Sequence, residues 1–290
     1  MKDMEQILKG YRHDAALRKS FNALAEATFG LNFEGWYQNG FWGDNYNPYS
    51  IMKDGRIVAN VSVNKTDMII GGARRRLYQL GTVRTDPAYR NRGYIREIMA
   101  EIDRDTADAD GVYLFGSDSV KEFYPKFGFV PGAEHVYEKA VSQSGACTAE
   151  RVMMDNAAAW QTLRAAMDQS APQAACEMAG NPELIFFYVS QFMQDCVYRC
   201  EALDAWVIAE MEEGNLTLHN VFCPREVSLD DVIAAFGGEV THVTLGFTPV
   251  NTDGFDCLPY HEEDCNFFVR GAGLDDFVQK KLRIPSLSHA

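Results

Sequence analysis

A basic turn that contains glycine carries the clearest chemical signal in this 290-residue sequence. Arg90, Arg92 and Gly93 form the turn, and an apolar segment at residues 78–83 precedes it. In residues 95–102, which follow it, apolar side chains recur at i, i+3, i+4 and i+7, which predicts a half-buried helix that begins near Gly93. A helix N-terminus offers free backbone N–H groups and a positive dipole end, and glycine lets a ligand approach the main chain. The turn therefore predicts a phosphate or pyrophosphate site.

A second segment, residues 111–129, contains a candidate catalytic tyrosine. Residues 112–115 are typical of a buried strand, residues 119–122 form a capping box, and Gly128 follows the expected helix end. Tyr124 lies on the apolar face of this predicted helix, where either a place in the core or a role at a cleft explains it. The strand at residues 78–83, the helix that begins near Gly93 and the strand at residues 112–115 follow one another along the chain. This order predicts that the two strands are parallel neighbours joined by a right-handed crossover.

These two segments resemble elements of the GCN5-related N-acetyltransferase (GNAT) superfamily. Residues 90–95, Arg-Asn-Arg-Gly-Tyr-Ile, are similar to its acyl-coenzyme A loop, Q/R-x-x-G-x-G/A, although Ile95 stands where the family prefers Gly or Ala. The branch that resembles the mycobacterial two-domain enhanced-intracellular-survival acetyltransferases shares this departure. Residues 111–129 resemble the family's closing element, and the resemblance covers nearly all of residues 1–141.

The resemblance implies a fold and a co-substrate. The fold is α/β (α+β), the GNAT fold, in which helices flank a central mixed sheet whose two parallel strands splay apart to admit the pantetheine arm. The implied co-substrate is acetyl-CoA. Ser117 stands where the family often has an Asn beside that arm. The implied cofactor-binding residues are Val83, Arg84, Arg90, Asn91, Arg92, Gly93, Tyr94, Ile95 and Ser117.

Acetyl transfer to an amine requires a neutral nucleophile, a donor for the thioester oxyanion and a proton for the leaving thiolate. The resemblance assigns thiolate protonation to Tyr124 and the oxyanion contact to the main-chain N–H of Val83. In the related two-domain enzymes the terminal carboxylate enters the active site as a base, which makes His289 and Ala290 candidates here. No base is evident among the other residues, and those that remain open, acting through water, are Glu26, Glu34, Asp44 and His135.

Residues 33–50 are rich in aromatic side chains and include two carboxylates. In the family this region covers the acceptor pocket. Aromatic faces near carboxylates suit an ammonium group through cation–π and ionic contacts. Packing of a second helix against the sheet explains the aromatic residues equally well. On the first interpretation the substrate-binding residues are Glu34, Trp36, Trp42 and Asp44.

Local signals define other elements of the first half. Asp14 is the expected N-cap of a helix that ends at Gly30. Asp54 and Gly55 predict the two-residue turn of a hairpin. Another strand is expected near residues 67–70.

Length and charge divide the chain, which is long for one acetyltransferase domain. Residues 1–146 hold 19 Lys and Arg against 19 Asp and Glu, whereas residues 147–290 hold 8 against 22, so the net charge of −14 lies entirely in the second half. We predict a GNAT domain at residues 1–141, a linker at 142–150 and a C-terminal domain at 151–290.

The C-terminal domain is predicted to be a degenerate GNAT-like domain with a helical lead-in. The lead-in covers residues 156–200, and residues 205–222, 228–236 and 242–247 follow as a hairpin, a helix and a strand. No basic glycine turn stands between the hairpin and the helix. A second acyl-coenzyme A site is therefore not expected.

Composition narrows the compartment and the partners. The N-terminus lacks an apolar signal core and no run is long enough to span a bilayer, which predicts a cytoplasmic protein without membrane contact. The seven cysteines lack the spacing of a disulfide or metal framework, and Cys196 and Cys200 are interpreted as buried residues of a helix. The acidic balance argues against nucleic acid and favours a cationic acceptor. Assembly into homo-oligomers stays open.

The last eight residues, 283–290, differ from a disordered tail because Ile284, Pro285 and Leu287 are apolar or rigid. We expect the tail to dock. It either covers the core of the second domain or enters the active site.

These features predict an N-acetyltransferase that transfers acetyl from acetyl-CoA to a primary amine of a small molecule or peptide by direct attack. The alternative is a non-catalytic acyl-CoA-binding sensor or partner-binding protein. Tyr124 favours the enzyme, whereas the missing base and Ser117 favour the sensor. Aminoglycosides, polyamines, amino acids and protein amines all remain open as acceptors.

Overall fold

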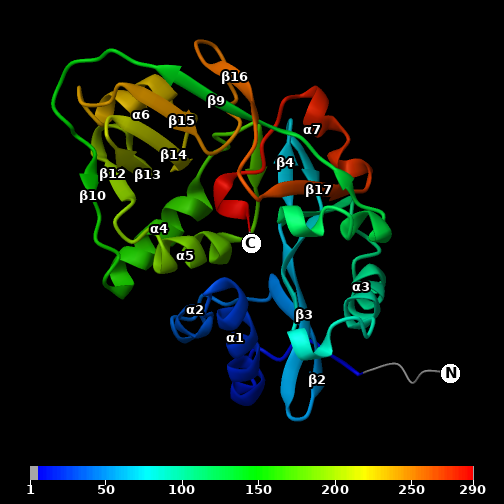
Figure 1. The fold of residues 1–290 in the computed structure, drawn as a ribbon. Helices are drawn as coiled ribbons and strands as arrows, with labels where there is room; N and C mark the ends of the chain where they lie inside the picture. Colours follow the sequence, from blue (N-terminus) through cyan, green and yellow to red (C-terminus); the bar gives the residue numbers. More distant parts are fainter. Residues whose placement is uncertain (1–5, 290) are drawn as a thin grey trace.

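Three β-sheets form the framework of the computed structural model, which describes residues 6–289 apart from the side chains at 276 and 278 (Figure 1). The first sheet has the order β1 (Ile7–Leu8), β2 (Tyr46–Lys53), β3 (Arg56–Lys65), β6 (Leu77–Thr85), β7 (Gly111–Gly116), β17 (Asn266–Arg270) and β8 (Val130–Pro131). The second has the order β10 (Glu150–Arg151), β12 (Val197–Cys200), β13 (Ala205–Glu212), β14 (Asn215–Phe222), β15 (His242–Leu245), β9 (Glu134–Ala140) and β16 (Asp256–Tyr260). A small third sheet joins β11 (Cys176–Met178), β4 (Met68–Ile70) and β5 (Ala73–Arg75).

Helices cover both faces of the first sheet. Figure 1 shows α1 and α3 on opposite sides of β2 and β3. Ile57 packs in the cluster of α1 and its neighbour Val58 in that of α3, because successive strand residues point to opposite faces. The α-helices of the described residues are α1 (Ala15–Phe29), α2 (Glu34–Gln38), α3 (Tyr94–Asp105), α4 (Ala157–Gln169), α5 (Pro182–Gln191), α6 (Leu229–Ala235) and α7 (Asp276–Gln279).

The local signals of the first half are confirmed. The Asp14 carboxylate caps α1 by accepting hydrogen bonds from backbone N–H groups of its first turn, and Gly30 ends the helix at φ 68°. Asp54 and Gly55, at φ 51° and 77°, connect β2 to β3. Gly93, at φ 88°, stands just before α3. Such left-handed turns are local, so the sequence signals them directly.

The hairpin, helix and strand predicted for the second half are also confirmed. β13 and β14 form the hairpin, α6 follows, and β15 pairs parallel to β14. The first sheet has the same order in β2, β3 and β6, with α3 between the parallel strands β6 and β7.

Two predicted helices are wrong. Residues 119–127 form two 3₁₀ turns, Asp118–Val120 and Tyr124–Phe127, because Pro125 lacks the N–H that a continuous α-helix needs. Residues 156–200 include two strands, β11 and β12, besides α4 and α5. Cys200 ends β12 and Cys196 precedes it, so this pair does not lie on a helix.

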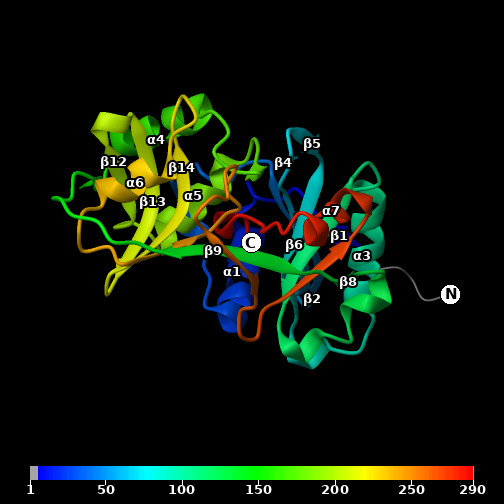
Figure 2. The same cartoon turned by 90° about the horizontal axis from the view of Figure 1, so that it is seen from above.

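Strands cross the boundary predicted at residues 142–150. β9, from the first half of the chain, pairs with β15 and β16 in the second sheet, and β17, from the second half, pairs with β7 and β8 in the first. Figure 2 shows β9 running between the two large sheets. The division into two domains stays a prediction, but neither large sheet is built from one half of the chain alone.

The C-terminal tail is docked, as its apolar residues predicted. Ile284, Leu287 and Ser288 are buried. Figure 1 places this end of the chain between the two large sheets. No helix within the described range is long and apolar enough to cross a bilayer.

Candidate active site

The candidate site is a cavity that opens where two parallel strands part. β6 and β7 pair only over residues 77–80 and 111–114, although both strands continue beyond this stretch. Past that point a cavity of about 420 Å³ separates residues 81–84 of β6 from residues 115–117. This arrangement is the splayed strand pair that the resemblance implied.

A β-bulge shapes the β6 wall of the cavity. Thr82 and Val83 stand opposite a single residue of β3, and Thr82 adopts φ 49°, which β-branched residues rarely do. The Nδ2 of Asn60 donates to the Thr82 carbonyl at 3.0 Å, and the Tyr46 hydroxyl lies 2.8 Å from Thr82 Oγ1. These contacts hold an irregular main chain at the cavity, where an N–H group can serve an oxyanion.

Tyr124 lines the same cavity from the opposite side. Its ring packs in the core against Phe129 and Phe268, and the side chain is 5% exposed. Burial raises the pKa of Tyr124 to about 12. Because this pKa is far above neutrality, the phenol keeps the proton that a general acid must donate.

Gly116 permits the close approach of Tyr124 to β7. A Cβ atom at position 116 would lie 2.7 Å from Cε2 of the Tyr124 ring. Real side chains do not tolerate such a contact, so any larger residue must displace the ring.

We expect Gly116→Ala to lower kcat about tenfold, because the ring moves from its place at the cavity and small displacements of catalytic groups are costly. Steady-state kinetics will measure this. Gly35→Ala is the matched control, since a Cβ at Gly35 makes only an ordinary 3.7 Å contact. Equal kcat in both variants would contradict a precise position for Tyr124.

His289 separates this cavity from a second one and lines both. Its ring stacks on Phe115, with centroids 3.8 Å apart and an interplanar angle of 16°. Burial, with a contribution from Arg283, lowers the pKa of His289 to about 3, so the imidazole is neutral near pH 7. Ala290, the other predicted base, lies outside the described residues.

Hydrogen bonds from both sheets hold the tail that carries His289. The Tyr113 hydroxyl donates to the Ser288 carbonyl at 3.1 Å. Ser286 Oγ lies 2.8 Å from His219 Nδ1, and the Ser286 N–H donates to the Gly246 carbonyl at 2.7 Å. The tail therefore positions His289 against a rigid wall.

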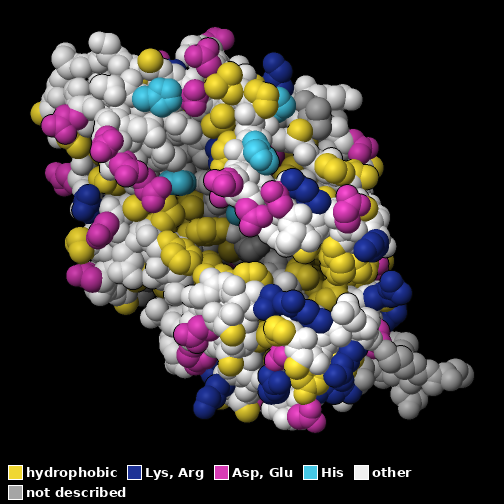
Figure 3. All heavy atoms as spheres, in the orientation of Figure 1, with side chains coloured by type: hydrophobic (Ala, Val, Ile, Leu, Met, Phe, Trp, Pro, Cys, Tyr) yellow, Lys and Arg dark blue, Asp and Glu magenta, His cyan; other side chains and the backbone are white. Residues whose placement is uncertain are grey.

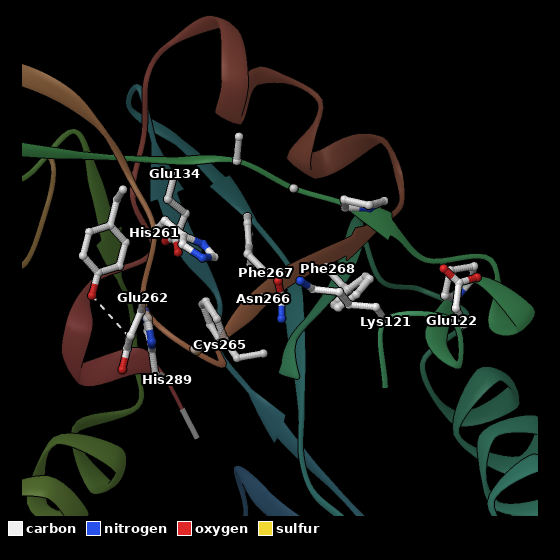
Figure 4. A pocket seen from close by; sticks show the side chains of 16 residues that line it. Lys121, Glu122, Glu134, His261, Glu262, Cys265, Asn266, Phe267, Phe268 and His289 are labelled. Carbon is white, nitrogen blue, oxygen red and sulfur yellow. Dashed lines mark hydrogen bonds between the residues drawn. The ribbon is translucent and has the colours of Figure 1, made fainter. Parts of the chain in front are cut away.

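The second cavity, of about 350 Å³, is lined by glutamates together with Lys121 and His261 (Figure 4). Glu122, Glu134 and Glu262 contribute to its lining. Burial raises the pKa of Glu134 to about 7, although its Oε1 accepts a hydrogen bond from the Ile284 N–H at 2.8 Å. A carboxyl group that titrates near neutrality thus lines the cavity that shares His289 with the first.

The basic loop lies exposed at the start of α3. Gly93 is the N-cap residue and makes no side-chain cap, and a Cβ there would meet open space. The side chains of Arg90 and Arg92 are exposed. The guanidinium of Arg92 donates to the Ala88 carbonyl at 3.1 Å and lies over the ring of Tyr89. The loop therefore has the geometry of an anion site.

Other predicted cofactor residues divide by side-chain position. The side chain of Tyr94 is buried and that of Ile95 is half-buried against the core of the first sheet, so only the main chain of these two residues is available to a ligand at the loop. The side chain of Asn91 is exposed. Arg84 and Ser117 line the cavity. Two buried atoms at the cavity, Nε of Arg84 and Nε2 of the shared histidine, have no hydrogen-bond partner among residues 6–289. A polar arm that enters the cavity would supply partners, which fits an acyl-CoA.

Of the predicted acceptor residues only Trp36 lines the cavity. Its indole N–H donates to the Glu183 carbonyl at 2.9 Å. Trp42 is buried in the same aromatic cluster. Glu34 pairs with Arg18, and Asp44 pairs with Arg12, in each case away from the cavity. The structure therefore does not bring Glu34, Trp42 and Asp44 to the site.

The other proposed bases also lie elsewhere. Glu26 is an exposed residue of α1, and His135 belongs to β9 and lines neither of the two cavities described above. Within the described part of the chain no group of three or more His, Cys, Asp or Glu is placed to hold a metal. Sequence reasoning missed the contribution of α5, from which Leu184, Phe187 and Tyr188 line the cavity. No local signal in those residues distinguishes a cavity wall from an ordinary core.

Comparison with known proteins finds a matching domain family and solved structures of the same fold. Residues 17–132 match the model of the acetyltransferase (GNAT) domain family. No curated protein sequence matches the chain.

Solved structures share the fold over most of the chain. A conserved protein of Enterococcus faecalis V583 has a TM-score of 0.59 at 15% identity, over 96% of this chain and 75% of its own. Eis1 from Mycobacterium abscessus has a TM-score of 0.56 at 13% identity, over 91% and 73%. A GCN5-related N-acetyltransferase from Kribbella flavida has a TM-score of 0.55 at 15% identity, over 91% and 72%.

These matches support the predicted fold class, a mixed α/β GNAT fold with splayed sheets and a second GNAT-like unit, as in Eis1. At such low sequence identity, the similarity to the solved structures shows the fold alone. The family model and the fold agree on residues 17–132, which form an acetyltransferase domain of the GNAT family.

Proposed function

We propose that this protein transfers the acetyl group of acetyl-CoA to a primary amine of a small molecule or peptide by direct attack. The observation that carries the proposal is that Tyr124 and the β6 bulge face one cavity where parallel strands part. GNAT domains generally use acetyl-CoA. The positions of the basic loop, the cavity and the phenol suit the phosphate end, the arm and the sulfur of that co-substrate.

This chain's own residues supply three parts of the reaction. As the amine nitrogen bonds to the thioester carbon, the N–H of Val83 stabilises the charge on the carbonyl oxygen. The C–S bond then breaks, and Tyr124 donates its proton to the departing thiolate. The loop at residues 90–93 holds the phosphates, while Arg84 and Ser117 contact the arm.

The proton of the attacking amine needs an acceptor. Neutral His289, with a buried Nε2 that no described residue pairs, is the candidate that the cavity offers. Ala290, which the family resemblance also suggested as a base, is the alternative.

We expect Gly93→Asp to weaken acetyl-CoA binding at least about tenfold, which corresponds to about 1.4 kcal/mol. Asp tolerates the left-handed backbone at φ 88°, but its carboxylate would enter the space where the pyrophosphate is proposed to bind. Calorimetry of acetyl-CoA binding measures the change.

The matched control is Gly254→Asp, because Gly254 has φ 78° and open space around its Cβ position. Equal affinity in the two variants would remove the loop from the site. Thiol release over a panel of amines then tests catalysis. Tight acetyl-CoA binding without turnover on any amine would favour the sensor.

A further inference from the structure

Part of the cavity lining is an aromatic and aliphatic wall. This wall comes from the end of α1, from α2 and from α5, and it consists of Phe29, Leu31, Trp36, Leu184, Phe187 and Phe192. Phe29 and Phe192 are 45% and 58% exposed and form the mouth. Figure 3 shows hydrophobic side chains gathered around the hollow at the centre of this face.

No carboxylate belongs to the described lining of this cavity. The basic side chains in the lining are those of Arg84 and His289, and His289 is neutral near pH 7. Two carboxylates that could have faced an ammonium group form ion pairs elsewhere. Glu34 pairs with Arg18, and Asp44 pairs with Arg12. A polycation in this space would lose its hydration without gaining a counterion from the described lining, which is unfavourable.

The same wall assists an amine that carries only one charge. Transfer into an apolar environment disfavours the ammonium form and lowers its pKa. A single amine would therefore lose its proton on entry, and the neutral nitrogen is the form that attacks. This explains how the site can work with a weak proton acceptor such as His289.

We propose that the acceptor is a monoamine with a bulky apolar body, aromatic or branched aliphatic, rather than a polyamine or aminoglycoside. This inference rests on the proposed function and specifies its substrate class. The body of the acceptor packs against the α1–α2–α5 wall, and its single amine points to the β6 bulge. The overall acidity of the chain, which suggested a cationic acceptor, does not extend into this cavity.

The test compares thiol release from acetyl-CoA with 2-phenylethylamine and with spermidine at pH 8. We expect kcat/KM to be about tenfold or more higher for 2-phenylethylamine. Phe192→Asp places a carboxylate at the mouth in an exposed position, so the protein should fold normally. This variant should lower kcat/KM for 2-phenylethylamine and raise it for spermidine. Met153→Asp, at a residue 56% exposed and outside the cavity, should change neither.

Each of the other outcomes would overturn either this inference or the proposed function. Faster turnover of spermidine, unaffected by Phe192→Asp, would assign the acceptor to the second cavity, where the glutamates lie. It would overturn the inference while the proposed function stands. The same assay with hexanoyl-CoA in place of acetyl-CoA tests the acyl chain. Faster turnover with hexanoyl-CoA, without discrimination among amines, would assign the wall to the acyl chain and also overturn the inference. Bound acetyl-CoA without thiol release on any amine would overturn the proposed function itself.

Discussion

Tyr124→Phe is expected to lower kcat about 10²-fold, the low end for the loss of a general acid. The hydroxyl group is the only part removed, and the ring contacts with Phe129 and Phe268 remain. No hydrogen bond of the hydroxyl is found in the described part of the chain, so the melting temperature should not fall. Acetyl-CoA affinity should also stay the same. Steady-state kinetics at saturating acetyl-CoA measures the loss.

The pH profile gives a second readout for Tyr124. Burial raises its pKa to about 12, so the phenol stays protonated from pH 7 to pH 10. Over that range the rate should rise as the acceptor amine loses its proton, without a descending limb from the general acid. The variant should show the same rise at a lower level. Tyr78→Phe is the control because Tyr78 lies on β6 but does not line the cavity. Full activity of Tyr124→Phe where chemistry limits the rate would make Tyr124 a core residue only.

His289→Phe is expected to lower kcat about 10²-fold at pH 7, because it removes the proposed proton acceptor. The aromatic ring that stacks on Phe115 is kept, so the loss should not come from unfolding. Thermal melts will verify this. The loss should shrink as the pH rises, because the attacking nitrogen must release a proton even when the amine enters neutral, and hydroxide can then accept that proton in place of His289. A purely structural role would give a loss that does not depend on pH.

A second variant distinguishes His289 from Ala290 as the proton acceptor. Two glycines added after Ala290 move the terminal carboxylate away while leaving His289 unchanged. Activity that survives in His289→Phe but falls in the extended chain would assign the base to the carboxylate. Unchanged activity in both would leave the tail a packing element and the base a water molecule.

The sequence by itself determined the elements whose causes are local. The N-cap at Asp14, the turn at Asp54 and Gly55 and the helix start at Gly93 depend on residues within one turn of each other. Because capping and left-handed turns need no distant partner, their signals can be read without a fold. The basic loop and the parallel strand pair were likewise predicted from neighbouring residues, whereas the place of Tyr124 beside the cavity was implied by the family resemblance.

Only the tertiary structure decided how distant segments meet. β17 fills a place beside β7, and β9 joins the second sheet, because strand pairing depends on partners far away in the chain. The arginines that take Glu34 and Asp44 away from the cavity could not be assigned from spacing. The aromatic wall is equally non-local: α5 lies about 150 residues from α2, and burial of apolar side chains has no preferred direction. The residues proposed to bind the co-substrate are therefore signalled by their neighbours in the sequence, whereas those proposed to bind the acceptor come together only in the folded chain.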